Sequence, residues 1–293
     1  LAYSQVLYAG AMFFGAHVST SGGIYKSVER AAAIGADAVQ LFTQSPRMWR
    51  PTAHSDENIA RFRELMIEHK MQGSVAHAIY LINIASPDDE LRAKSETALM
   101  NTMKTGEQLG LDAVIFHPGS HKGHETGLDG CIDRMAKSIA ATLEESTNTW
   151  LLLENSAGQG GTIGRDLPEL ARLVALVDHP RLGICIDTCH WYVSGVDVTD
   201  PAVLDNHLDE LDATIGLPRL RALHINDSKA TLGSNLDRHE NIGDGLLGEG
   251  LATFLRHPKL QGLGAYLETP GDGDGPTTDQ ITRARALAGA RKM

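Results

Sequence analysis

Cysteine is scarce in this sequence, and its scarcity excludes two classes of protein. The 293 residues contain three cysteines, Cys131, Cys185 and Cys189. An odd and small number argues against a disulfide framework and favours a reducing compartment. Cys185 and Cys189 form one C-x3-C pair without a second pair, so we interpret both as small buried side chains rather than as part of a zinc finger.

Long apolar runs are also missing. No run approaches the roughly 20 residues that a membrane-spanning helix requires. The mildly apolar residues 1–14 have no lysine or arginine ahead of them, which makes them a poor secretory signal. We therefore expect a cytoplasmic protein without a membrane partner. We also expect residues 1–11 to be an N-terminal extension outside the fold, with Met12 as the natural start and residues 12–293 as a single domain.

Positive charge is the third shortage. The sequence has 26 lysines and arginines against 37 aspartates and glutamates, which is a formal net charge of −11. That balance by itself argues against a nucleic-acid partner, because a surface that binds DNA is usually basic. Hydrophobic residues make up 42% and charged residues 22% of the chain, as is typical of a soluble globular protein.

Short apolar segments alternate with longer amphipathic ones along the chain. Eight segments have the length and composition of buried strands: residues 13–16, 38–42, 74–77, 113–116, 150–154, 182–187, 220–224 and 265–268. Helical patterns, with apolar residues three and four positions apart, lie between them, for example at residues 24–34, 57–70, 90–109 and 167–177. Asp88 and Asp166 are placed to cap the last two of these helices.

This alternation predicts βα units and a parallel sheet. Eight units in a chain of this length favour a closed (β/α)8 TIM barrel, whose active site lies at the C-terminal mouth of the strands. The alternative is an open, doubly wound sheet. No G-x-G-x-x-G motif follows the first strand, which further weakens a dinucleotide-binding interpretation.

Seven of the predicted strands end in a histidine or an acidic residue: His17, His77, His117, Glu154, Asp187, His224 and Glu268. A single histidine at a strand end is usually a structural group. Several carboxylates that converge on one mouth repel each other, so their pKa values rise unless a cation lies between them. Imidazole and carboxylate ligands suit zinc, with manganese or iron as alternatives. His190 and the Asp237-Arg-His239 loop add further candidate ligands.

Longer motifs surround these ligands, in this order along the chain: His77-x2-Tyr80-Leu-Ile-Asn, Phe-His117-Pro-Gly-Ser, Leu-Glu154-Asn-x-Ala-Gly-Gln-Gly, Cys-Ile-Asp187-Thr-Cys-His190, His224-x-Asn-Asp-Ser-Lys and Asp237-Arg-His239-Glu-Asn-Ile-Gly. Together they resemble bacterial endonuclease IV, the apurinic/apyrimidinic endonucleases of base-excision repair. The resemblance covers nearly the whole chain, from Gly15-Ala-His-Val-Ser to Glu268-Thr.

The resemblance implies a (β/α)8 barrel that binds three Zn²⁺ ions, with Mn²⁺ or Fe²⁺ as substitutes. Carried over residue by residue, it assigns the first ion to His77, His117 and Glu154. It assigns the second ion to Glu154, Asp187, His224 and Glu268, and the third ion to His190, Asp237 and His239. Glu154 would then bridge two ions, and Glu154 and Glu268 would be the catalytic residues.

The resemblance also implies an activity and a partner. The activity is hydrolysis of the phosphodiester 5′ to an abasic site, which leaves a 3′-hydroxyl and a 5′-deoxyribose phosphate, together with trimming of blocked 3′ ends. The partner is double-stranded DNA with abasic or 3′-blocked lesions, bound by a monomer. Arg47, Tyr80 and Leu81 would contact the DNA, and His17 would line the site. Divalent ions and basic loop residues at the mouth would create a positive field on an acidic body, which predicts strongly salt-dependent binding.

Two other functions are compatible with the barrel. A metal-dependent sugar isomerase or epimerase has the same fold and a similar set of acidic and histidine residues at its strand ends. Such an enzyme would not require the additional candidates His77, His117, His190, Asp237 and His239. A non-catalytic DNA-binding or scaffold protein would be expected to have lost some ligands, whereas the sequence retains all of them.

Overall fold

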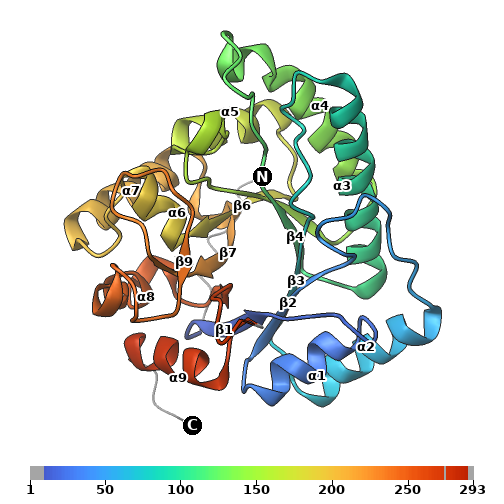
Figure 1. The fold of residues 1–293 in the computed structure, drawn as a ribbon, viewed down its shortest axis with the longest axis vertical. Coiled ribbons are helices and arrows are strands. Elements are labelled where there is room, and N and C mark those ends of the chain that lie inside the picture. The colour runs from blue at the N-terminus through green and yellow to red at the C-terminus, as the bar shows by residue number, and fades with distance from the viewer. Residues whose placement is uncertain (1–9, 274, 290–293) are drawn as a thin grey trace.

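A closed barrel of eight parallel strands forms the centre of the molecule (Figure 1). The computed structural model describes residues 10–273 and 275–289. The barrel strands are β1 (Phe13–His17), β2 (Ala38–Phe42), β3 (Gly73–His77), β4 (Ala113–Phe116), β5 (Trp150–Glu154), β6 (Leu182–Asp187), β7 (Leu220–Ile225) and β10 (Gly264–Leu267). Parallel pairing of β1 with β10 closes the sheet. The predicted TIM barrel is therefore confirmed, and the open sheet is excluded.

Helices surround the barrel and cover its outer face (Figure 1). They are α1 (Lys26–Ala33), α2 (Asp56–Glu68), α3 (Asp89–Leu109), α4 (Ile132–Leu143), α5 (Leu167–Val177), α6 (Thr188–Ser194), α7 (Pro201–Thr214), α8 (Leu251–Leu255) and α9 (Thr278–Leu287). Short 3-10 segments lie at Gly127–Gly130, Gln159–Gly161, Leu217–Arg219, Gly248–Gly250 and Pro258–Leu260. A small antiparallel hairpin, β8 (Asp227–Ser228) with β9 (His239–Glu240), projects from the end of β7.

The predicted helices at residues 90–109 and 167–177 agree with α3 and α5 to within one residue, and each has its predicted capping residue. Asp88 accepts a hydrogen bond from the backbone N–H of Leu91 at the start of α3, and Asp166 accepts one from Glu169 at the start of α5. The expected start of the first helix was wrong by two residues. No side chain caps α1, and the N–H of Lys26 bonds to the carbonyl of Gly23 in a tighter turn that precedes the helix.

Strand residues alternate between two apolar layers, because successive side chains of a strand point to opposite faces. The outward residues pack under the helices in one large core. The inward residues fill the barrel with a smaller cluster: Ala38, Val75, Ala113, Ile115, Leu152, Cys185, Ala222 and Tyr266. A Cβ on Gly15, Gly73 or Gly264 would collide with the Tyr266 side chain, so these three glycines make room for it.

The described residues contain no helix that is long and apolar enough to cross a membrane. The predicted N-terminal extension, residues 1–11, lies almost entirely outside the described residues. Met12, the first residue of the predicted domain, is buried and its N–H lies 3.4 Å from Oε1 of Gln261. The division at residue 12 stays a prediction.

Candidate metal centre and DNA-facing mouth

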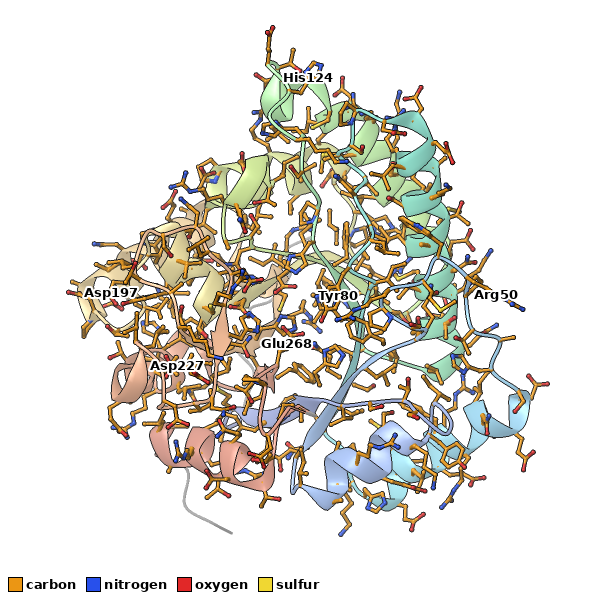
Figure 2. The ribbon with its side chains drawn as sticks, in the orientation of Figure 1. Arg50, Tyr80, His124, Asp197, Asp227 and Glu268 are labelled. Atoms are coloured by element: carbon orange, nitrogen blue, oxygen red, sulfur yellow. The ribbon has the colours of Figure 1, made fainter. Side chains whose placement is uncertain are left out.

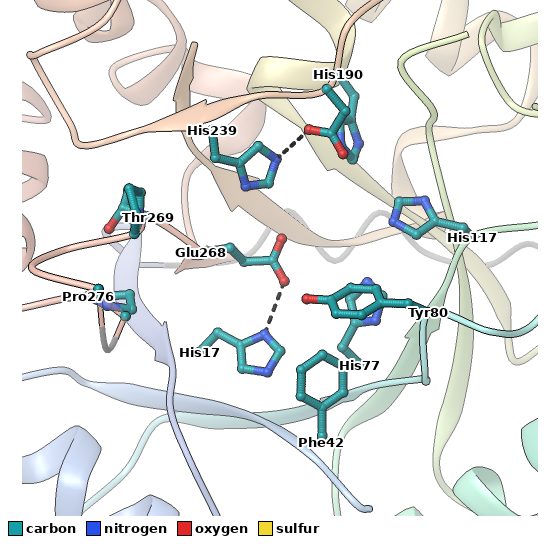
Figure 3. A pocket seen from close by; sticks show the side chains of 14 residues that line it. His17, Phe42, His77, Tyr80, His117, His190, His239, Glu268, Thr269 and Pro276 are labelled. Atoms are coloured by element: carbon teal, nitrogen blue, oxygen red, sulfur yellow. Dashed lines mark hydrogen bonds and ion pairs between the residues drawn. The ribbon is translucent and has the colours of Figure 1, made fainter. Parts of the chain in front are cut away.

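A polar cavity of about 430 Å³ opens at the carboxyl ends of the barrel strands (Figure 3). Its wall contains six of the predicted ligands, His77, His117, His190, Asp237, His239 and Glu268, together with His17, Phe42 and Tyr80. The histidines and acids at the ends of β1, β3, β5 and β6 share the inward parity of the barrel core. They face the same space because, on an inward-facing row of side chains, the residue two positions beyond the barrel core lies at the mouth.

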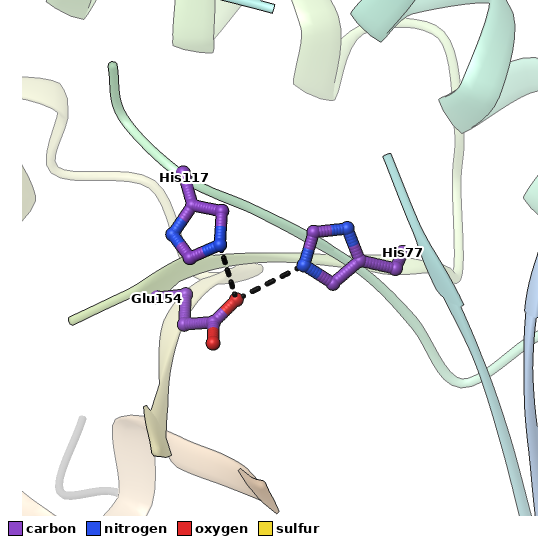
Figure 4. A group of neighbouring side chains, drawn as sticks. All are labelled: His77, His117 and Glu154. Atoms are coloured by element: carbon purple, nitrogen blue, oxygen red, sulfur yellow. Dashed lines mark hydrogen bonds and ion pairs between the residues drawn. The ribbon is translucent and has the colours of Figure 1, made fainter. Parts of the chain in front are cut away.

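The first group consists of His77, His117 and Glu154 (Figure 4). Nε2 of His77 lies 3.1 Å and Nε2 of His117 lies 3.4 Å from Oε2 of Glu154. Glu154 is fully buried, so its carboxylate depends on these partners for compensation of its charge. The three side chains come from the ends of β3, β4 and β5, which are neighbours in the barrel.

The second group shares Glu154 with the first. Ligand atoms of Glu154, Asp187, His224 and Glu268 all lie within 4.8 Å of one another. Nδ1 of His224 lies 2.8 Å from Oε1 of Glu154 and 3.5 Å from Oε2 of Glu268. The two oxygens of Glu154 therefore face different groups, as a bridging carboxylate requires.

The third group differs in two respects from the expected set. Ligand atoms of Asp187, His190 and His239 lie within 4.8 Å of one another. The expected partner Asp237 is also in contact, with its carboxylate oxygens 3.3 Å from Nε2 of His190 and 3.2 Å from Nε2 of His239. Cys189 lies within 4.8 Å of Asp237 and His239 as well. The structure thus brings the three predicted residues together and adds Asp187 and a buried thiol at their edge.

Asp227 of β8, which Figure 2 labels, binds the backbone on both sides of the loop that carries Asp237 and His239. This carboxylate is completely buried. It accepts hydrogen bonds of 2.8–3.1 Å from the backbone N–H groups of Ser228, Gly243, Gly245, Leu247 and Gly248. Hydrogen bonds to an ionised carboxylate are strong, so Asp227 ties the start of the β8–β9 hairpin to the turn that follows it.

Acids and several of the imidazoles stabilise each other's charged forms in this cluster. Burial opposes ionisation of His239, but the carboxylates of Asp187 and Asp237 outweigh it and raise the pKa of the ring to about 9. Burial also opposes ionisation of Glu154, yet the neighbouring imidazoles hold its pKa well below the usual range. The pKa of Glu268 is lowered in the same way. Glu154 and Glu268 are therefore ionised, which is the form that binds a cation.

The donor set fits divalent metal ions. Each of the groups combines imidazole nitrogens with carboxylate oxygens, which is the ligand chemistry of zinc and of related first-row metals. The members are largely buried and their ligand atoms lie within 4.8 Å of one another, so that without a cation the acids depend on protonated histidines. The residues at the mouth are therefore suited to hold divalent cations.

One inward residue was missed by the sequence analysis. Gln40 on β2 is completely buried and contacts His17, His224 and Glu268. β2 is the strand whose apolar run ends without an acid or a histidine. A glutamine in the middle of the run Ala-Val-Gln-Leu-Phe is the signal that could have identified it, because a polar side chain inside a barrel strand must find partners at the mouth.

The predicted DNA-contact residues lie around the mouth rather than within the metal groups. Tyr80 is 62% exposed, and its ring packs edge-on against Phe42 at 5.2 Å, beside the cavity. Leu81 is half-buried and packs against the apolar core. Arg47 is exposed on the loop between β2 and α2, where Trp49 also packs against the core. His17 lines the cavity and lies 3.1 Å from Glu268 (Figure 3).

Comparison with known proteins agrees with this geometry. Residues 28–290 match the family of xylose isomerase-like TIM barrels. The chain is 40% identical over 264 residues to the probable endonuclease 4 of Thermosipho africanus, which covers 89% of this chain and 93% of that relative. The solved endonuclease IV of Thermus thermophilus superposes with a TM-score of 0.83 at 34% identity, covering 95% of this chain and 100% of that one.

A further solved structure shares the barrel at lower sequence identity. A D-tagatose 3-epimerase-like protein superposes with a TM-score of 0.71 at 20% identity and covers 94% of this chain and 95% of its own. That likeness is evidence for the fold alone. The identity and coverage of the endonuclease relatives decide the assignment: the chain belongs to the endonuclease IV family, within the xylose isomerase-like TIM barrels.

Proposed function

We propose that this protein is a metal-dependent DNA-repair endonuclease that hydrolyses the phosphodiester 5′ to an abasic site. The products are a 3′-hydroxyl and a 5′-deoxyribose phosphate, and the same site trims blocked 3′ ends, which are also phosphate esters. The observation that carries the proposal is the joining of three ligand groups at one mouth, two of them through the shared carboxylate of Glu154. A phosphodiester needs this concentration of cation-binding groups because its negative charge repels a nucleophile.

The metal groups have separate parts in the proposed reaction. His77, His117 and Glu154 would hold one ion, and Asp187, His224 and Glu268 would join Glu154 around a second. His190, Asp237 and His239 would hold a third. Bound Zn²⁺ ions, or Mn²⁺ or Fe²⁺ in their place, would lower the pKa of water and offset the charge that gathers on the phosphate.

Glu268 is the carboxylate best placed to orient the attacking water. It is 14% exposed at the side-chain level, whereas Glu154 is completely enclosed, and it projects into the cavity between His17 and His239 (Figure 3). His17 lies against Oε1 of Glu268 and limits the rotation of that carboxylate. Glu154 contributes by binding His77 through one carboxylate oxygen and His224 through the other, which keeps the first two ligand groups close together.

The rim residues would hold the damaged strand. An abasic nucleotide must leave the helix to reach a barrel mouth, and side chains must fill the space that it vacates. Tyr80 stands exposed beside the cavity, and Leu81 follows it. Although the residue as a whole is exposed, desolvation of its phenol beside the cavity, followed by the charges of Glu268 and Glu154, raises the pKa of Tyr80 to about 12, so the phenol stays neutral and can donate a hydrogen bond. Arg47 adds a positive charge on the neighbouring loop.

The protein would act on a duplex as a monomer, because one chain forms the whole mouth.

The test uses an end-labelled duplex with a single tetrahydrofuran abasic analogue, incubated with the protein before and after prolonged treatment with a chelator. The analogue cannot undergo β-elimination, so only a hydrolase can cut it. We expect one cut on the 5′ side, a 3′ end that a polymerase can extend, loss of cutting after metal removal and recovery when Zn²⁺ is returned. The undamaged duplex is the control. An intact lesion duplex with metal-replete protein would refute the proposal, and sugar isomerisation would be assayed next.

A further inference from the structure

Gln40 connects two proposed metal ligands that come from distant parts of the chain. It lies on β2 beside His17 of β1, with which it is in register, and it is completely buried inside the barrel. Its Oε1 lies 2.8 Å from Nε2 of His224 on β7. Its Nε2 lies 2.5 Å from Oε1 of Glu268, which follows β10, and 2.9 Å from Nδ1 of His17.

The hydrogen-bonding capacity of these groups determines where the protons are. An ionised carboxylate can only accept, so the amide nitrogen of Gln40 must face Glu268 and its oxygen must face His224. The amide oxygen is also only an acceptor. Nε2 of His224 must therefore carry a proton and donate it to Gln40.

This arrangement leaves the other atoms of the same two residues directed at the metal centre. Nδ1 of His224 faces Oε1 of Glu154 at 2.8 Å and Oε2 of Glu268 at 3.5 Å. Oε1 of Glu268 is occupied by Gln40 and His17, whereas Oε2 is the oxygen that faces His224. Gln40 thus bonds to one atom of each residue, Nε2 of His224 and Oε1 of Glu268. The other atoms, Nδ1 of His224 and Oε2 of Glu268, are left to bind a metal ion.

We propose that Gln40 is a positioning residue of the second metal group, which selects Nδ1 of His224 and Oε2 of Glu268 as the ligand atoms. This inference rests on the proposed function only in its assumption that the group binds a metal ion. Partners of this kind fix the tautomer and the orientation of a ligand, and their loss typically weakens metal binding by about 10- to 100-fold. Gln40 does not touch the reacting phosphate in this role.

A purely structural role makes different predictions. A glutamine that only satisfies buried polar groups would affect stability when replaced, without any preference for one metal ion. The chain offers a matched control in Gln261, whose amide nitrogen donates to the backbone carbonyls of Leu255 and His257. Gln261 precedes β10, at the opposite end of that strand from Glu268.

The experiment compares Gln40→Met and Gln261→Met in equilibrium competition for Zn²⁺ against a chromophoric chelator, with thermal unfolding recorded in parallel. We expect Gln40→Met to lower the affinity for one Zn²⁺ ion by about 10- to 100-fold. The affinities for the remaining ions should stay near their original values. Gln261→Met should leave every affinity unchanged. Zinc affinities of Gln40→Met within about twofold of those of the unmodified protein, well short of the loss expected for a supporting partner, would overturn the inference.

A second measurement does not depend on whether the variant folds. Nitrogen-15 NMR of the zinc-loaded, unmodified protein distinguishes a histidine that is protonated on Nε2 from one that is protonated on Nδ1. We expect His224 to carry its proton on Nε2, and a proton on Nδ1 would refute the role of Gln40. Failure of the unmodified protein to bind any Zn²⁺ would instead refute the proposed function, so the two failures are distinguishable.

Discussion

Glu154 and His224 lie 2.8 Å apart, Oε1 to Nδ1, although they come from β5 and β7, which are separated by β6. The other oxygen of the same carboxylate lies 3.1 Å from His77 of β3. Glu154 therefore joins histidines from both sides of its own strand. This position makes it the residue whose charge matters most to the proposed metal centre.

Replacement of Glu154 by glutamine should abolish cleavage with little change of shape. The amide keeps the volume of the side chain but removes the negative charge that two groups share. Loss of a supporting partner typically lowers metal affinity or activity by roughly 10- to 100-fold, and loss of a ligand should lower it further. Single-turnover cleavage of the tetrahydrofuran duplex should fall by more than about 100-fold. Glu57→Gln, an exposed change on α2, is the control and should cut normally. Wild-type rates for Glu154→Gln would contradict the bridging role.

Removal of the metal ions should lower thermal stability as well as activity. Ions that bind only the folded protein stabilise it by about 2.7 kcal/mol when their concentration is about 100 times the dissociation constant. We expect that addition of Zn²⁺ to chelator-treated protein raises Tm by roughly 5 °C. Differential scanning fluorimetry measures this shift, and Mg²⁺ at the same concentration is the control. An unchanged Tm with Zn²⁺ would argue against these ligand groups binding the ion.

Substitution of Arg47 should affect DNA binding without affecting the metal centre. Its side chain is exposed on the loop between β2 and α2, so loss of one phosphate contact should weaken binding and reduce the slope of log K against log salt by about 1. Fluorescence anisotropy with a labelled lesion duplex at several salt concentrations measures both. Arg61→Ala on the outer helix α2 is the matched control. Equal slopes for the two variants would remove Arg47 from the interface.

Glu107 should make the stability of the fold dependent on pH in the acidic range. Burial opposes its ionisation, but hydrogen bonds from Thr147, Thr149 and Asn148 outweigh burial and lower its pKa from 4.5 to about 2. A lowered folded-state pKa stabilises the protein above the unfolded value, and this contribution disappears as the pH falls from about 4.5 through about 2. Urea unfolding at several pH values should show that the free energy of unfolding falls less steeply with decreasing pH in Glu107→Gln than in the unmodified protein. Parallel declines in both proteins would refute this contribution.

Gly15→Ala should destabilise the barrel although the change adds one methyl group. A Cβ at this position would collide with the Tyr266 ring, which is buried and enclosed by β-strands. Overpacking of this kind typically costs about 1–3 kcal/mol, which chemical denaturation can measure. The double variant with Tyr266→Leu should lose less stability than the sum of the single changes, because the smaller side chain leaves room for the methyl group. Strict additivity would show that the two residues do not compete for space.

The sequence by itself determined the strands, the main helices and the candidate ligands. Short apolar runs identify strands locally, and the polar residue that ends a run marks the mouth whatever the arrangement of the other strands. The caps Asp88 and Asp166 were also readable, because a capping side chain bonds within its own helix turn. The grouping of the ligands around particular ions came from the family resemblance rather than from spacing along the chain.

Only the tertiary structure decided which atoms face each other across the barrel. Closure between β1 and β10 brings His17 to Glu268, and it places Gln40 of β2 between Glu268 and His224. The fold also brings His239 of β9 to Asp187 at the end of β6 and to His190 of α6, so that Asp187 joins the third group. The alternation of side chains repeats every second residue, so it predicts which face of a strand a residue occupies. It does not predict contacts between strands that are far apart in the chain, such as the one between Gln40 and Glu268, which are 228 positions apart.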